Sequence, residues 1–235
     1  MHYDHLEKAV FRERKNRFVA EVEFQGSVIG VHVPNTGRCR ELFQPGVPVY
    51  IQRAANLARK YPYTLCIVEK NGMLVHIDSA GANRLVEEAL NAGSIAGLED
   101  VTDVEREKTF GSSRFDFRFR KGGRLCFMEV KGVTLETDGV AKFPDAPTER
   151  GARHLEELIS VKEQGLGAYV MFVIQMKGPH TFTPHVERDE KFARNLLRAK
   201  KAGVEVLAYD TIVTAGDIRL DAPVKICLPG EEMML

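Results

Sequence analysis

One segment, Ala168–Met176, constrains the fold more than any other part of this 235-residue chain. It reads Ala-Tyr-Val-Met-Phe-Val-Ile-Gln-Met, an almost unbroken apolar run. A strand of this kind is typical of a sheet that is covered on both faces, usually by helices that connect parallel strands. A helix expected at 189–202, with Gly203 as its stop, and a strand at 204–209 would complete such a βαβ unit. The C-terminal part is therefore predicted to be α/β.

The first third of the chain has a different pattern. Residues 17–77 show apolar alternation typical of strands, with Phe18 and Phe24 in the same phase as the core positions between them. Further strands are expected at 47–52, 65–70 and 73–78, the last two joined by Asn71-Gly72, a strong hairpin signal. Five short strands with tight turns predict a small closed or partly open barrel.

The character of the sequence changes near residue 80. A helix is expected at 82–92, strands at 101–108, 113–120 and 125–131, and a helix at 148–164 with Thr148 as its N-cap. The predicted organisation is a β-barrel domain over residues 1–80 and an α/β domain with a mixed central sheet over residues 81–235. The fold class is accordingly α+β / α/β.

Composition excludes some function classes. The chain has 33 Lys and Arg against 33 Asp and Glu, so it lacks the strong basic excess of many nucleic-acid-binding proteins. Its N-terminus has no signal-peptide pattern, and no apolar stretch is long enough to cross a bilayer. The four cysteines are scattered, without metal-ligand spacing. We expect a reduced, cytoplasmic protein that needs no membrane.

The residues that indicate chemistry lie in a predicted hairpin over 113–131. If Gly122-Gly123 forms its two-residue turn, the numbers of paired residues sum to 245, and Asp116 lies directly opposite Glu129. Strict alternation would place the three Phe of 113–119 on one face and Asp116 on the other. Lys131, two residues after Glu129, points to the same side as Glu129.

Two carboxylates this close repel each other. A hard cation such as Mg²⁺ or Mn²⁺ would remove the repulsion. Lys131 could then lower the pKa of an attacking water or stabilise charge on a phosphate. This set is suited to metal-assisted phosphodiester hydrolysis. The alternative is a surface lattice of salt bridges, each contributing about 0–1 kcal/mol, and a turn one residue longer or shorter would separate the two acids.

These residues also carry a family resemblance. Arg114-x-Asp116-Phe117 followed by Glu129-Val130-Lys131 resembles the PD-(D/E)xK nuclease-like superfamily. More specifically, the chain is similar to the sugar fermentation stimulation protein family. The supporting segments span most of the chain: His32-x-Pro34-Asn35-Thr36-Gly37, Asn83-Arg84-Leu85, the stretch from Glu129 to Leu135, and Phe143-Pro144-Asp145-Ala146-Pro147-Thr148-Glu149-Arg150-Gly151.

The resemblance implies an OB-like barrel joined to a PD-(D/E)xK-type domain, DNA binding, and a link to regulation of sugar (maltose) metabolism. It makes Asp116 and Glu129 metal ligands and Lys131 the catalytic lysine. A third acidic ligand is expected from the preceding helix. Helical geometry does not separate Glu87 from Glu88, and the resemblance favours Glu88.

Basic residues expected to contact nucleic acid are Arg14, Lys15, Arg17, Arg38 and Arg150. A charge run like that at 12–17 is more often a solvated strand or loop start. The turn Asn35–Arg38 could bind a phosphate through its N–H groups, or be an ordinary turn. Because Phe18 and Phe24 are in the core phase, we expect backbone contacts rather than base readout.

A second group of polar side chains falls on one side of the helix that follows Thr148. Arg150, His154 and Glu157 are spaced to share that side. They could flank the metal site or approach the substrate phosphate. They could equally form an exposed helix face with one satisfied histidine.

Three functions remain open at this stage. The first is a Mg²⁺- or Mn²⁺-dependent nuclease. The second is a non-catalytic DNA-binding regulatory factor whose nuclease-like site is silent. The third is an enzyme that acts on small phosphoesters or nucleotides. The sequence leaves open whether the chain is an enzyme, and only the resemblance supports recognition of a promoter-type sequence.

Overall fold

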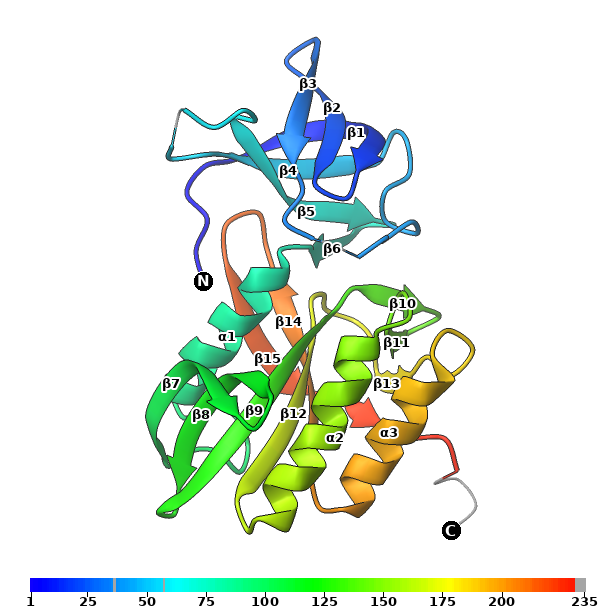
Figure 1. The fold of residues 1–235 in the computed structure, drawn as a ribbon. Helices are drawn as coiled ribbons and strands as arrows, with labels where there is room; N and C mark the ends of the chain where they lie inside the picture. Colours follow the sequence, from blue (N-terminus) through cyan, green and yellow to red (C-terminus); the bar gives the residue numbers. More distant parts are fainter. Residues whose placement is uncertain (36, 57, 231–235) are drawn as a thin grey trace.

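The computed structural model describes residues 1–35, 37–56 and 58–230. Within these residues the chain forms an N-terminal barrel stacked on one end of a larger α/β domain, as Figure 1 shows. This arrangement confirms the predicted fold class. No helix in the described ranges is long and apolar enough to cross a membrane.

The barrel is built from one coiled sheet. Its strands run in the order β3-β2-β1-β4-β5-β6, and a parallel bridge between His32 and Thr64 joins β3 to β5 and closes it. The strands are β1 (Leu6–Asn16), β2 (Val19–Phe24), β3 (Ser27–His32), β4 (Pro48–Arg53), β5 (Tyr63–Lys70) and β6 (Met73–His76). The predicted Asn71-Gly72 turn is present, because Lys70 pairs with Met73 and both turn residues have positive φ.

The alternating pattern indicates a first strand only from Phe18, and the run at 12–17 is predicted as a solvated strand or loop start, whereas β1 begins at Leu6. The reason is that β1 carries charged side chains on its outer face, where Arg12 pairs across the sheet with Glu23. The expectation that Phe18 belongs to the core is wrong. Phe18 lies in the turn between β1 and β2, where alternation does not apply, and its side chain is 52% exposed.

The α/β domain has a six-stranded sheet in the order β15-β14-β12-β9-β8-β7. The three central strands β9, β12 and β14 are parallel and the outer pairings are antiparallel, so the predicted mixed sheet is confirmed. Its strands are β7 (Val101–Phe110), β8 (Ser113–Lys121), β9 (Arg124–Val133), β12 (Gly167–Ile174), β14 (Glu205–Val213) and β15 (Ile218–Pro223).

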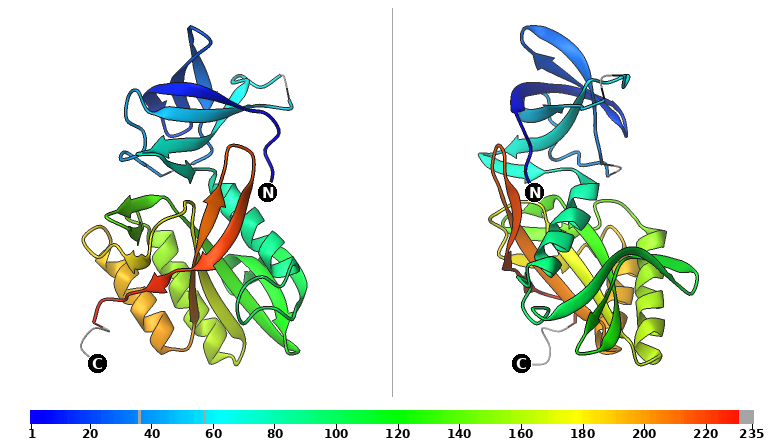
Figure 2. Two further views of the ribbon diagram at one scale, coloured as in Figure 1. Left: turned by 180° about the vertical axis from the view of Figure 1, so that it is seen from behind. Right: turned by 90° about the vertical axis from the view of Figure 1, so that its left-hand side faces the viewer.

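Helices cover both faces of this sheet, as the two views in Figure 2 show. Helix α1 (Ser79–Asn91) packs on one face, and α2 (Glu149–Glu163) and α3 (Glu190–Lys201) pack on the other. A small second sheet, which the sequence did not indicate, lies beside α3. It consists of β10 (Leu135–Thr137), β11 (Val140–Phe143), β13 (Thr181–Pro184) and β16 (Lys225–Ile226).

Strand β12 is buried along its whole length, as its apolar sequence predicts. Val170 and Phe172 pack toward α2 and α3, whereas Met171 and Val173 pack toward α1. Burial of each large side chain stabilises the fold by about 1.5–3 kcal/mol. Gly167 begins the strand where a Cβ would lie 2.3 Å from the sulfur of Cys126, so the close approach of β9 and β12 requires glycine there.

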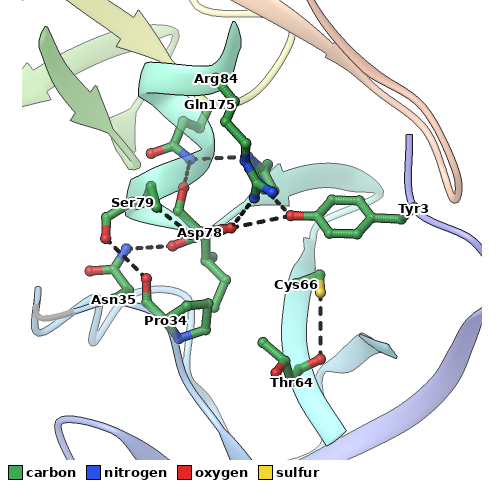
Figure 3. Close-up of polar contacts among 12 residues, drawn as sticks. Tyr3, Pro34, Asn35, Thr64, Cys66, Asp78, Ser79, Arg84 and Gln175 are labelled. Carbon is green, nitrogen blue, oxygen red and sulfur yellow. Dashed lines mark hydrogen bonds and ion pairs between the residues drawn. The ribbon is translucent and has the colours of Figure 1, made fainter. Parts of the chain in front are cut away.

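A buried polar cluster joins the two domains (Figure 3). His76, at the end of β6, contacts the Tyr3 hydroxyl at 2.9 Å and the Gln175 side-chain nitrogen at 3.1 Å. Asp78 caps α1 and also accepts a hydrogen bond from Arg84 at 2.6 Å. Burial lowers the pKa of His76 to about 3, so this histidine is neutral in the folded protein.

Candidate active site

The β8–β9 hairpin has the predicted register. Gly122 and Gly123 occupy the turn with φ of 54° and 79°, and Lys121 pairs with Arg124. Pairing continues in the same register as far as Phe117 and Met128. Asp116 and Glu129 are the next residues on the two strands, so the hairpin brings these acids together as the sequence predicts.

The expected strict alternation along β8 fails at Asp116. Phe117 packs in the core beneath α1, whereas Phe115 packs on the opposite face, with its ring 6.0 Å from that of His154 in α2. The three phenylalanines therefore do not share one face. The cause is local, because the ladder ends at Phe117 and the Asp116 side chain instead accepts a hydrogen bond from the backbone N–H of Val130 at 2.8 Å.

Asp116 is held from two directions. Its second oxygen accepts a hydrogen bond from Asn83 of α1 at 2.8 Å. Burial, followed by the negative charge of Glu129, raises the pKa of Asp116 despite these donors. Asn83 belongs to the segment Asn83-Arg84-Leu85, which supports the family resemblance. The sequence alone gives Asn83 no individual role, because nothing in the pattern shows which side chain of the helix meets β8.

Glu129 lies buried on the central strand β9. One of its oxygens, Oε1, is 2.5 Å from Lys131 Nζ and 2.5 Å from His154 Nδ1. The other, Oε2, is buried and has no hydrogen-bond partner among the described residues. Burial acts to raise the pKa of Glu129, but the hydrogen bond from His154 and the charge of Lys131 outweigh it, and the net shift is downward.

His154 connects the site to α2. Its Nδ1 donates to Glu129, and its Nε2 accepts a hydrogen bond from Arg150 Nε at 3.3 Å. Of the three residues expected on one helix side, His154 and Arg150 reach the site, whereas Glu157 accepts a hydrogen bond from Ser112. The predicted N-cap Thr148 is confirmed, with its side chain 3.0 Å from the N–H of Gly151.

The acids of α1 lie elsewhere. Glu88 is exposed and binds the amino group of Met1 at 2.7 Å, and Glu87 pairs with Arg106 at 3.4 Å. The structure therefore does not bring the predicted third ligand, Glu88, to Asp116 and Glu129. The face of α1 that meets Asp116 presents Asn83 instead.

The basic residues predicted to bind nucleic acid differ in whether their side chains already have partners within the protein. Arg14 donates to the backbone carbonyls of Asn16, Arg17, Asn35, Gly37 and Arg38, and its guanidinium lies 4.8 Å from the centre of the Phe43 ring. Lys15 pairs with Glu13 and Glu21. Arg14 thus organises the loop rather than presenting its donors to a ligand.

The predicted phosphate-binding turn is filled by the protein itself. The N–H groups of Arg38 and Cys39 donate to the carboxylate of Asp145, at 2.9 and 3.4 Å, and the N–H of Gly37 donates to the Asn35 side chain. Thr36 lies outside the described residues. A phosphate cannot use these donors while Asp145 holds them, so the geometry favours the other interpretation of this segment, an ordinary turn.

The residues at the hairpin fit a hard divalent cation. The orphaned Glu129 Oε2 is the atom that such an ion would satisfy, and a carboxylate oxygen that already accepts one hydrogen bond, as in Asp116, retains a second lone pair. The described residues contain no group of three or more His, Cys, Asp and Glu side chains placed to hold a metal. Two protein carboxylates with water and phosphate oxygens are a usual Mg²⁺ environment.

The fold and the site together define a class of protein. It consists of an OB-type barrel and an α/β domain with a mixed sheet, and a hairpin of the α/β domain carries Asp116, Glu129 and Lys131. A family model described as the SfsA N-terminal OB domain matches residues 13–77, and one described as the sugar fermentation stimulation protein RE domain matches residues 80–217. The chain therefore belongs to the sugar fermentation stimulation protein family.

Individual relatives agree with this assignment. A sugar fermentation stimulation protein homolog from Clostridium tetani is 48% identical over 95% of this chain and 97% of its own length. One from Clostridium botulinum (strain Hall) is 49% identical over 93% and 96%. Among solved structures, Pyrococcus furiosus SfsA in complex with Ca²⁺ is similar, with a TM-score of 0.90 and 29% identity over 97% of this chain and 98% of that chain.

Proposed function

We propose that this protein is a DNA-binding, divalent-metal-dependent nuclease in which Asp116 and Glu129 hold Mg²⁺ or Mn²⁺ and Lys131 is the catalytic lysine. The observation that carries the proposal is the buried Glu129 oxygen without a partner, close to a second buried acid and a lysine. The similar structure from Pyrococcus furiosus is a complex with Ca²⁺, a cation that prefers the same oxygen ligands.

Electrostatics favours a cation over a purely structural role for the pair. Burial of a charged group without full compensation costs several kcal/mol, and the Asp116 pKa is raised by burial and by Glu129. One lysine and one histidine supply the compensation, both at the same Glu129 oxygen. A divalent cation would satisfy the other oxygen and remove the repulsion between the two acids.

Each residue then has a distinct task. A bound divalent cation would polarise the scissile phosphate and favour deprotonation of the attacking water. Lys131 stabilises negative charge that develops on the phosphate. His154 and Arg150 hold Glu129 in one orientation, in the way that hydrogen-bonded outer residues support metal ligands. Asn83 and the Val130 N–H do the same for Asp116.

A second candidate function is a non-catalytic DNA-binding regulator. One contact favours this second function, because Lys131 forms a short ion pair with Glu129. In this arrangement a protein side chain already compensates part of the charge of the buried Glu129 carboxylate, without a metal ion. The two functions share DNA binding that weakens as salt rises. Only the nuclease requires Lys131 for turnover.

The test is cleavage of labelled DNA by the purified chain with Mn²⁺, Mg²⁺ or a chelator. We expect metal-dependent cleavage that falls at least about 100-fold in Lys131→Met and in Asp116→Asn. Lys121→Met, which changes an exposed lysine in the same hairpin, is the matched control and should cleave normally. Metal-dependent cleavage that persists in both site variants would contradict the proposal. DNA binding without cleavage by the wild type would favour the regulator.

A further inference from the structure

A pocket of about 970 Å³ lies between the barrel and the α/β domain. One wall comes from the turn after β1 and from Asn35 and residues 37–44. The other comes from the residues that follow Lys131 and from the segment 142–148. The sequence segments at 32–37 and 143–151, which the active site uses only in part, meet at this pocket.

The pocket is lined by cations that no group in the described residues neutralises. Four side chains in its lining have no hydrogen-bond or ion-pair partner in the described part of the chain: Arg17, Arg38, Arg40 and Lys142. The lining contains one acid, Asp145, whose carboxylate is held by two backbone N–H groups. The lining thus has four cationic side chains without a partner in the described residues, and its one carboxylate is already hydrogen-bonded. This excess of positive charge would attract an anionic ligand that carries several charges.

Arg14 explains how these cations are placed. Its guanidinium binds the carbonyls of both Arg17 and Arg38, at 2.7 and 2.8 Å. The turn after β1 and the loop after β3 are thereby tied together at the rim of the pocket. Arg14 is therefore a positioning residue, and its neighbours carry the free charges.

An exposed aromatic residue follows the charged turn in the sequence. Phe18 comes directly after Arg17 of the pocket lining and is 52% exposed. Aromatic side chains near basic ones are the usual composition of a surface on which nucleic-acid bases stack.

The size of the pocket selects between forms of nucleic acid. The volume of about 970 Å³ is at the upper end of the range for sites that enclose a small ligand, about 300–1,000 Å³. This volume suits a few unpaired nucleotides better than a duplex. The pocket is next to the candidate active site along the chain, because Gly132 in its lining follows Lys131, and Thr148 in its lining is the N-cap of α2, which carries Arg150.

We infer that this pocket holds an unpaired strand of nucleic acid, with its phosphates against Arg17, Arg38, Arg40 and Lys142 and a base stacked on Phe18. The inference rests on the proposed function and specifies its substrate class. The substrate is DNA with a single-stranded end or segment next to the position that is cleaved, rather than an uninterrupted duplex.

The experiment is fluorescence anisotropy of the full chain without added metal, which separates binding from cleavage. The probes are a blunt duplex and the same duplex with a single-stranded overhang that contains 2-aminopurine. We expect the overhang to bind at least about tenfold more tightly, and the 2-aminopurine emission to fall on binding as the base stacks. The double variant Arg38→Ala/Arg40→Ala should lose at least about tenfold in overhang affinity.

Matched variants distinguish the pocket from charge and surface effects in general. Phe18→Ala should abolish the emission change, whereas Val28→Ala, another exposed apolar residue of the barrel, should not. Lys201→Ala, at the end of α3 away from the pocket, should bind the overhang normally. Equal binding of blunt and overhang DNA would overturn the inference. So would wild-type affinity in the double variant, or competition by a mononucleotide as strong as by the overhang.

Failure of this inference and failure of the nuclease proposal give different results. If the overhang binds in the pocket but is never cleaved with Mn²⁺, only the nuclease proposal fails. If blunt duplex is cleaved equally well by the wild type and the double variant, only the pocket assignment fails.

Discussion

The Nδ1 atom of His154 lies 2.5 Å from Oε1 of Glu129, the same oxygen that Lys131 contacts, and this leaves Oε2 without a partner in the described chain. A helix on one face of the sheet thus sets the orientation of a carboxylate on the central strand. The direction of the free oxygen depends on that histidine.

Replacement of this histidine should therefore weaken metal binding and cleavage without removing a ligand. We expect His154→Ala to lower Mn²⁺ affinity and cleavage rate about 10–100-fold, as for other residues that support metal ligands. The measurement is a Mn²⁺ titration of the rate of DNA cleavage. His180→Ala, which changes an exposed histidine, is the control. Normal metal dependence in His154→Ala would show that the contact is only structural.

The buried histidine at the domain junction predicts a pH dependence of stability. His76 has a pKa lowered to about 3 by burial, whereas an unfolded histidine has a pKa of about 6.5. Between these values the unfolded chain binds one more proton, so the stability that neutral His76 contributes is complete above about pH 6.5 and is lost as the pH falls toward 3. The slope from this one group is about 1.4 kcal/mol per pH unit.

Urea unfolding between pH 7 and pH 4 measures this slope. His76→Asn should flatten the pH dependence by up to that amount, while His5→Asn, at an exposed position, should not. An identical slope in wild type and His76→Asn would mean that the buried ring titrates normally.

Gly81 gives a test of packing at the same junction. A Gly→Ala change inside a helix ordinarily stabilises by about 1 kcal/mol. In α1, however, the new Cβ would lie 2.3 Å from Cε1 of His76, and that ring is held at both nitrogens. We expect Gly81→Ala to lower the free energy of unfolding by about 1–3 kcal/mol. In Gly216→Ala the nearest atom is 3.8 Å away, and unfolding should be nearly unchanged. Equal stabilities of the two variants would contradict the packing described.

Arg14 should be sensitive even to a conservative change. Lysine has no planar fork, so Arg14→Lys cannot bind the carbonyls of Arg17 and Arg38 together. We expect a loss of about 1–3 kcal/mol in stability, mainly from the part-buried carbonyls of Asn35 and Gly37 left without their donor. Arg12→Lys, which only alters an exposed ion pair, should cost less than about 1 kcal/mol. Thermal unfolding of the two variants makes the comparison.

The sequence predicted those features that follow from local rules. The Gly122-Gly123 turn determined the hairpin register, and with it the approach of Asp116 and Glu129, because strand pairing from a two-residue turn is fixed. The apolar run of β12 and the helix stops indicated the α/β class. What the sequence could not predict depends on tertiary contacts. Asn83 and His154 reach the acids from helices on opposite faces of the sheet, and no local pattern gives that geometry.

The errors have equally specific causes. Phe18 was assigned to the core because its phase matched the strand, although it lies in a turn where phase has no meaning. The turn near Gly37 left a phosphate site open as an alternative, because the sequence does not show that Asp145, more than 100 residues later, occupies its N–H groups. A distant segment decides the use of that turn, whereas for Phe18 the local turn decides.

The central claim is that Asp116 and Glu129 hold a divalent cation. The most direct measurement is calorimetric titration of Mn²⁺ into the wild type, Asp116→Asn and Glu129→Gln, with Glu99→Gln on an exposed loop as the control. The account predicts one site in the wild type and the control, and its loss in both site variants while their circular dichroism is unchanged. Equal binding in all four proteins, or none in the wild type, would contradict it.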